Sequence, residues 1–140
     1  MILDSQERFS NGQAISGVVG TVVSTDVYDT GAAADVGAGE ELYLFSKLDT
    51  ALAGAGSSIQ AVLQDSADNS SFADVMGGPV IALAAALVNT PLAKMRLPLG
   101  LRRYLRVAYK TTGATSTGGT ASSYLAKDVQ ANTTYPTSIS

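Results

Sequence analysis

The sequence contains no cysteine, no histidine and no tryptophan among its 140 residues. Without cysteine there is no disulfide, no thiolate nucleophile and no zinc–thiolate site, so folding does not depend on an oxidising compartment. Without histidine the chain lacks the commonest general base and the commonest ligand of transition metals. We therefore expect a protein that is not an enzyme and that needs neither a cofactor nor a metal.

Charged residues are also scarce, at 15% of the chain, and the net charge is −3. A weakly acidic chain has no electrostatic footprint for nucleic acid. Long hydrophobic runs are missing as well. The longest run, Pro79–Val88, is far shorter than the roughly 20 residues that a membrane-spanning helix needs. We expect neither a nucleic acid nor a membrane as a partner.

The clearest positive signal lies at residues 103–110. Leu105, Val107 and Tyr109 alternate there with Tyr104, Arg106, Ala108 and Lys110. A period of two in aromatic and β-branched residues is typical of a strand with one buried and one wet face. This stretch predicts a strand whose first set of side chains is core.

Shorter segments repeat the pattern along the chain. We predict strands at residues 17–29, 42–48, 57–64, 72–76, 80–83, 92–97 and 121–129, with a tight helical turn or loop after residue 83. Residues 31–41, 49–56, 65–71 and 111–120 are rich in Gly, Ala, Ser or Thr and read as loops. Short strands at this spacing predict an all-β fold, a jelly-roll-like β-sandwich of about seven or eight antiparallel strands. We divide the chain into an N-terminal arm (1–16, with at most one short strand), the sandwich (17–129) and a C-terminal tail (130–140).

Two motifs have a functional and a plain interpretation. Asp65, Asp68 and Asn69 offer oxygen ligands to Ca²⁺, but their spacing is not that of an EF-hand, and the same residue types are ordinary turn formers. The basic group formed by Arg102, Arg103, Arg106 and Lys110 is either the solvated face of one strand or a contact patch for an acidic protein surface.

Five stretches, taken in order, resemble the cement (decoration) proteins of tailed-bacteriophage capsids. They are Met1-Ile-Leu-Asp4 with Phe9-Ser-Asn-Gly-Gln-Ala14, Gly37-Ala-Gly-Glu-x-Leu-Tyr43, Leu63-Gln-Asp-Ser66, Arg103-Tyr-Leu-Arg106, and Asp128-Val-Gln130 with Tyr135-Pro136. The resemblance covers nearly the whole chain. It implies a jelly-roll-like sandwich that binds the outside of the head as a homo-oligomer.

From this resemblance we expect a virion protein of the outer capsid surface, made in the host cytoplasm. Its partners are then the major capsid protein and further copies of itself, as a dimer or a trimer. The candidate contact residues are Ile2, Leu3, Phe9 and Tyr135 in the arms, and Tyr104, Arg106 and Lys110 on the wet face of the strand at 103–110. The alternative is a carbohydrate-binding or adhesion module, since jelly rolls also serve as lectins. The absence of tryptophan argues against it.

Overall fold

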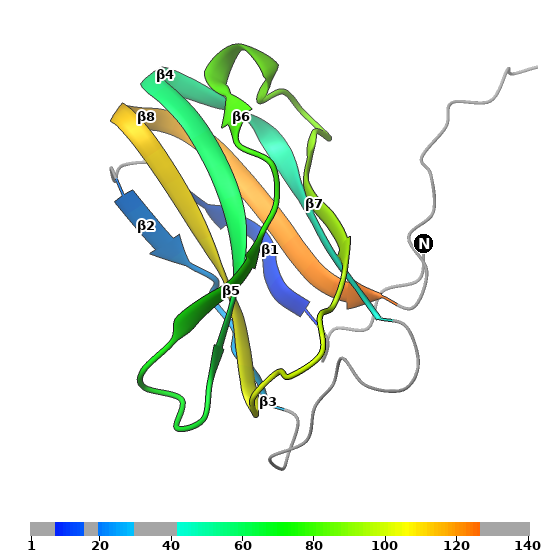
Figure 1. Ribbon diagram of the computed structural model, residues 1–140. Coiled ribbons are helices and arrows are strands. Elements are labelled where there is room, and N and C mark those ends of the chain that lie inside the picture. Colours follow the sequence, from blue (N-terminus) through cyan, green and yellow to red (C-terminus); the bar gives the residue numbers. More distant parts are fainter. Residues whose placement is uncertain (1–7, 16–19, 30–41, 127–140) are drawn as a thin grey trace, which may run out of the picture.

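The computed structural model describes residues 8–15, 20–29 and 42–126, except for the side chains of 55–57 and 114–116 (Figure 1). This part of the chain is built of antiparallel strands and one 3-10 turn, with no α-helix in these ranges. The elements are β1 (Arg8–Ala14), β2 (Gly20–Val23), β3 (Tyr28–Asp29), β4 (Tyr43–Ser66), β5 (Ala73–Gly77), β6 (Ile81–Ala82), η2 (Leu83–Ala85), β7 (Pro91–Arg96) and β8 (Tyr104–Ala126). No helix in these residues is long and apolar enough to cross a membrane.

Two strands of 24 and 23 residues, β4 and β8, form the frame of the molecule. They pair antiparallel from Tyr43 opposite Ala126 to Ser66 opposite Tyr104. The first half of β4 also pairs with β7, and the second half of β8 pairs with β1. The other halves carry β5 and β6 on β4, and β2 and β3 on β8. One hydrogen-bonded sheet thus supplies both layers of the sandwich, with β4 and β8 passing from one layer to the other.

The pairing pattern is that of a jelly roll. When each long strand is counted as two segments and β2–β3 and β5–β6 as one each, the chain has eight segments in order. Segment one pairs with eight, two with seven, three with six and four with five. This is the arrangement of a long hairpin rolled into two four-stranded sheets. The predicted all-β sandwich is confirmed.

The predicted loops at residues 49–56 and 111–120 are wrong, because these residues are the middle parts of β4 and β8. The two strands stay paired there through a series of register shifts between Leu48 and Ser58. Strands that switch from one sheet to the other bend at such bulges. Gly119 shows why small residues are used, since its φ is +135° and an added Cβ would lie 3.2 Å from Leu52 Cδ1.

The other predicted strands appear with changed limits. The strand expected at 17–29 is split into β2 and β3 by residues 24–27, where the Ser24 hydroxyl accepts a hydrogen bond from the backbone N–H of Val107 at 3.1 Å. The segment at 80–83 is β6 followed by the turn η2, and 92–97 corresponds to β7. The strand β1 corresponds to the single short strand that we expected at most in the N-terminal arm. Because β1 pairs with β8, the described part of that arm belongs to the sandwich. Residues 1–7 and 127–140 lie outside the described residues.

The core between the layers confirms the alternation of residues 103–110. Leu105, Val107 and Tyr109 are completely buried, together with apolar residues of β1, β4 and β7. Tyr109 reaches across the core from one sheet to the other. Its hydroxyl donates to Ser10 Oγ at 2.9 Å and also bonds Ser123 Oγ, which donates to Ser46 Oγ at 2.7 Å. A buried hydroxyl group is costly without a partner, and this cluster supplies partners from three strands.

Candidate protein-contact surface

Of the seven expected contact residues, the structure describes Phe9, Tyr104, Arg106 and Lys110, whereas Ile2, Leu3 and Tyr135 lie outside the described residues. The assignment of Phe9 needs correction. Its side chain is fully buried in the core, because β1 pairs with the second half of β8 and turns Phe9 inward. Phe9 is therefore a core residue of the sandwich.

Tyr104, Arg106 and Lys110 lie on the outer face of β8, as the alternation predicts, and each is half-buried. This face of β8 is less exposed to solvent than expected, because Ala108, which lies between these residues, is completely buried. Ala108 stands opposite Val62 of β4 on one side and Val23 of β2 on the other. Neighbouring strands on both sides thus limit the solvent that reaches this row.

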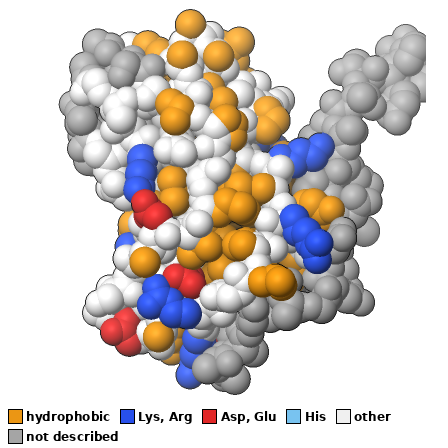
Figure 2. All heavy atoms as spheres, viewed as in Figure 1, with side chains coloured by type: hydrophobic (Ala, Val, Ile, Leu, Met, Phe, Trp, Pro, Cys, Tyr) orange, Lys and Arg blue, Asp and Glu red, His pale blue; other side chains and the backbone are white. Residues whose placement is uncertain are grey.

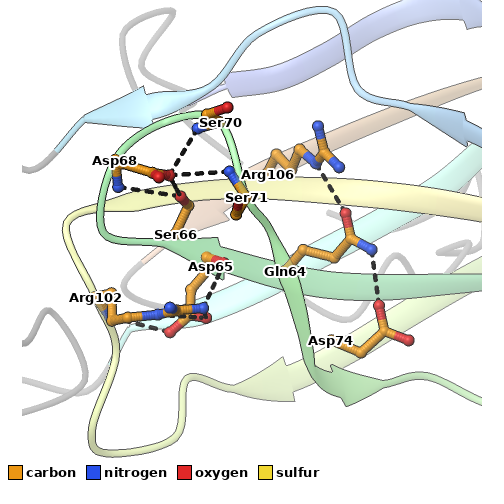
Figure 3. Close-up of polar contacts among 9 residues, drawn as sticks. All are labelled: Gln64, Asp65, Ser66, Asp68, Ser70, Ser71, Asp74, Arg102 and Arg106. Carbon is orange, nitrogen blue, oxygen red and sulfur yellow. Dashed lines mark hydrogen bonds and ion pairs between the residues drawn. The ribbon is translucent and has the colours of Figure 1, made fainter.

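Arg106 and Lys110 are joined by a polar chain that crosses three strands, and Figure 3 draws its part from Arg106 through Gln64 to Asp74. Arg106 Nε donates to Gln64 Oε1 at 2.8 Å, and Gln64 Nε2 donates to Asp74 Oδ1 at 2.7 Å. The ammonium group of Lys110 donates to the other oxygen of Asp74. This hydrogen bond with Lys110, followed by that with Gln64, lowers the pKa of Asp74 below its usual value. Phe72 completes the group, with its ring centroid 3.9 Å from the Arg106 guanidinium carbon.

Two further arginines next to this chain make ion pairs within the protein. Arg102 Nη2 lies 2.7 Å from Asp65 Oδ1, and the backbone N–H of Arg102 donates to Asp65 Oδ2 at 3.1 Å. Arg103 binds Asp29 with two nitrogens, Nε at 2.8 Å and Nη2 at 3.1 Å. These hydrogen bonds raise the pKa of both guanidinium groups. The basic group thus contains several internal pairs as well as side chains that face outward.

The acidic loop after β4 uses its carboxylates to hold the turn. Asp68 Oδ1 accepts hydrogen bonds from the backbone N–H groups of Ser70 and Ser71, each at 2.9 Å, and from Ser66 Oγ at 2.8 Å (Figure 3). The hydrogen bond from Ser71, then those from Ser66 and Ser70, lower the pKa of Asp68 to about 2. The carboxylate of Asp65 accepts a hydrogen bond from the guanidinium group of Arg102. In the described ranges no three Asp or Glu side chains gather as a metal site would require.

Four strongly exposed apolar side chains were missed as contact candidates by the sequence pattern. They are Val80, Leu87, Val88 and Leu99, with exposures of 63, 59, 57 and 72%. The first three belong to the segment between β5 and β7, and Leu99 lies between β7 and β8. The apolar run Pro79–Val88 indicated that this segment is unusual, but an apolar run does not show which of its side chains face the solvent.

The model of the family Bbp16 matches residues 9–125. These limits run from the second residue of β1 to the last but one of β8 and so take in nearly the whole of the described sandwich. No curated protein matches the chain.

Proposed function

The chain belongs to the Bbp16 family, which is phage-related, and we propose that it is a cement protein of a bacteriophage capsid. In this role it is a structural virion protein that binds the outer surface of the head and stabilises the shell of the major capsid protein. It acts as a homo-oligomer, a dimer or a trimer, after synthesis in the host cytoplasm. The family membership, the jelly roll and the ordered motifs that resemble cement proteins support this proposal.

The structural observation that carries the proposal is the apolar segment between β5 and β7. Val80, Leu87 and Val88 are more than half exposed, and Ala84 and Ala85 beside them are exposed too. Figure 2 has hydrophobic atoms gathered at the top of the molecule, where Figure 1 places the turn after β6. Single exposed apolar residues are common, but several on one short segment are typical of a protein-contact surface.

The energetics of cementing need no chemistry beyond such contacts. A protein that binds the assembled shell and not the dissociated subunits stabilises the shell by mass action. This effect reaches about 4 kcal/mol per site at a concentration of a thousand times Kd. If each oligomer touches two or more shell subunits, avidity adds to this without any new contact.

The test measures binding of the protein to purified, expanded heads that were assembled without it. We expect saturable binding of the wild type and heads that resist heating better when it is bound. A double variant, Leu87→Asp with Val88→Asp, should lose most of this binding, because the two charges would be buried at the contact. Val27→Asp is the matched control, since Val27 is also an exposed valine but lies outside this segment, in the link between β2 and β3.

The results separate the function from the surface. Wild-type protein that does not bind heads at all would refute the cement function. Wild-type binding that the double variant retains in full would leave the function standing and refute the apolar segment as the contact.

A further inference from the structure

Arg106 differs from the other cations around it. Arg102 pairs with Asp65, Arg103 with Asp29 and Lys110 with Asp74. In the described part of the chain, Arg106 has no carboxylate partner, and its hydrogen bond goes to the neutral amide of Gln64. Among the four basic side chains, the guanidinium group of Arg106 is therefore the one without a counter-charge in the residues that the structure describes.

This guanidinium group is nonetheless held in place on two sides. Its Nε is bound to Gln64, which is 8% exposed and is itself fixed by Asp74. Its central carbon lies over the ring of Phe72, an arrangement that favours arginine through cation–π attraction. In Figure 3 the hydrogen bond to Gln64 comes from Nε, and neither terminal nitrogen of Arg106 has a hydrogen-bond partner in the described residues. The two terminal nitrogens of Arg106 are thus a pair of hydrogen-bond donors whose orientation is fixed in advance, which we call the fork.

The environment of the fork favours a single planar anion. Burial lowers the pKa of Arg106 and no acid in the described part of the chain opposes this effect, whereas hydrogen bonds to Asp65 and Asp29 raise the pKa of Arg102 and Arg103. A partly desolvated guanidinium gains most from a carboxylate, whose two oxygens match its parallel donors.

A polyanion such as nucleic acid is disfavoured at this place. The four basic side chains stand among four acidic ones, so that the local charge balances, and binding to a phosphate backbone depends on an excess of positive charge. The acidic residues are Asp29, Asp65, Asp68 and Asp74.

We propose that the terminal nitrogens of Arg106 bind one carboxylate side chain of the capsid shell protein. This inference rests on the proposed cement function and names one polar contact within it. Gln64 and Phe72 are then positioning residues, because they fix the fork before the partner arrives. A side chain that is fixed in advance loses less conformational entropy on binding.

The experiment compares four proteins on purified, expanded heads that were assembled without this chain: wild type, Arg106→Lys, Arg106→Gln and Lys94→Gln. Lysine keeps the charge but cannot donate from a planar fork, so both Arg106 variants should raise the Kd for heads, by about 10- to 100-fold. Lys94 is the matched control because it is an exposed cation on β7, opposite Phe45 in the first half of β4, whereas Arg106 lies opposite Gln64 in the second half, and its loss should leave the Kd unchanged. Thermal melting of each free variant establishes that it is folded.

Each outcome decides the question. If the wild type binds and Arg106→Lys binds equally well, the fork is refuted while the cement function stands. If the wild type fails to bind, the cement function falls and this contact falls with it. Loss of self-association in sedimentation, with head binding per protomer unchanged, would assign the carboxylate to a second copy of the chain and overturn the proposal. If Arg106→Gln does not fold, the comparison of Arg106→Lys with the wild type decides alone.

Discussion

Replacing Tyr109 by phenylalanine tests whether the buried hydroxyl cluster joins the two sheets. The side chain of Tyr109 is completely buried, and its hydroxyl bonds Ser10 Oγ and Ser123 Oγ from strands of the other layer. Phenylalanine keeps the ring and removes both hydrogen bonds. Each is worth about 0.5–1.5 kcal/mol net, so the free energy of unfolding should fall by about 1–3 kcal/mol.

The serines limit the loss to this range. Ser10 still donates to Gln13 Oε1 at 2.7 Å and Ser123 still donates to Ser46 at 2.7 Å, so neither hydroxyl is left wholly without a partner. Urea unfolding at neutral pH and fixed protein concentration measures the change, since stability depends on concentration if the protein is an oligomer. Tyr104→Phe is the matched control because it removes the same atom from the half-exposed face of the same strand, and it should change stability by less than about 0.5 kcal/mol. Equal losses in both variants would refute a structural role for the cluster.

Three further predictions follow from the fold and the loops. Gly119→Ala should lower the free energy of unfolding by at least about 1 kcal/mol because of its positive φ, whereas Gly118→Ala, whose φ is not in that region, should cost less; urea unfolding of the pair decides this. The folded-state pKa of Asp68 is about 2, below the value of 3.8 for a free aspartate, so its stabilising effect is complete above pH about 4 and is lost as the pH falls toward 2. Asp68→Asn should therefore be less stable than the wild type at pH 6 and equal to it near pH 2, and a constant difference would contradict the assignment. Phe9→Ala should lower the free energy of unfolding by about 3–5 kcal/mol because Phe9 is a core residue. A change near zero in urea unfolding would contradict its burial.

The sequence predicts local alternation well and long-range pairing poorly. The strand containing Leu105, Val107 and Tyr109 could be predicted because each residue reports its own face through a period of two. The middle parts of β4 and β8 could not, since their Gly and Ala residues disfavour strands and interrupt the Thr residues that favour them, so that these parts are ordered by pairing with each other. The burial of Phe9 likewise depends on β8, more than a hundred residues away in the sequence.

For the contact surface too, local alternation was predictable and long-range pairing was not. The outward direction of Arg106 and Lys110 follows from the strand pattern, but their partners come from β4, β5 and the loop between these two strands. Which side chain meets Arg106 is set by the register of these strands, including a register shift between Leu63 and Gln64. A sequence pattern identifies the basic group, and only the pairing shows that Arg106 is its one member without a carboxylate partner among the described residues.

The apolar segment and the Arg106 fork should respond differently to salt. Charge pairs at a partly exposed surface weaken as the screening length falls, from about 10 Å at 0.1 M salt to about 3 Å at 1 M, whereas burial of apolar surface does not weaken. The difference in head binding between the wild type and Arg106→Gln should thus shrink over this range, while the effect of Leu87→Asp with Val88→Asp should persist. Binding isotherms of the three proteins at both salt concentrations measure this. If the gap between wild type and Arg106→Gln is the same at both, Arg106 acts through packing and not through an ion pair with the shell.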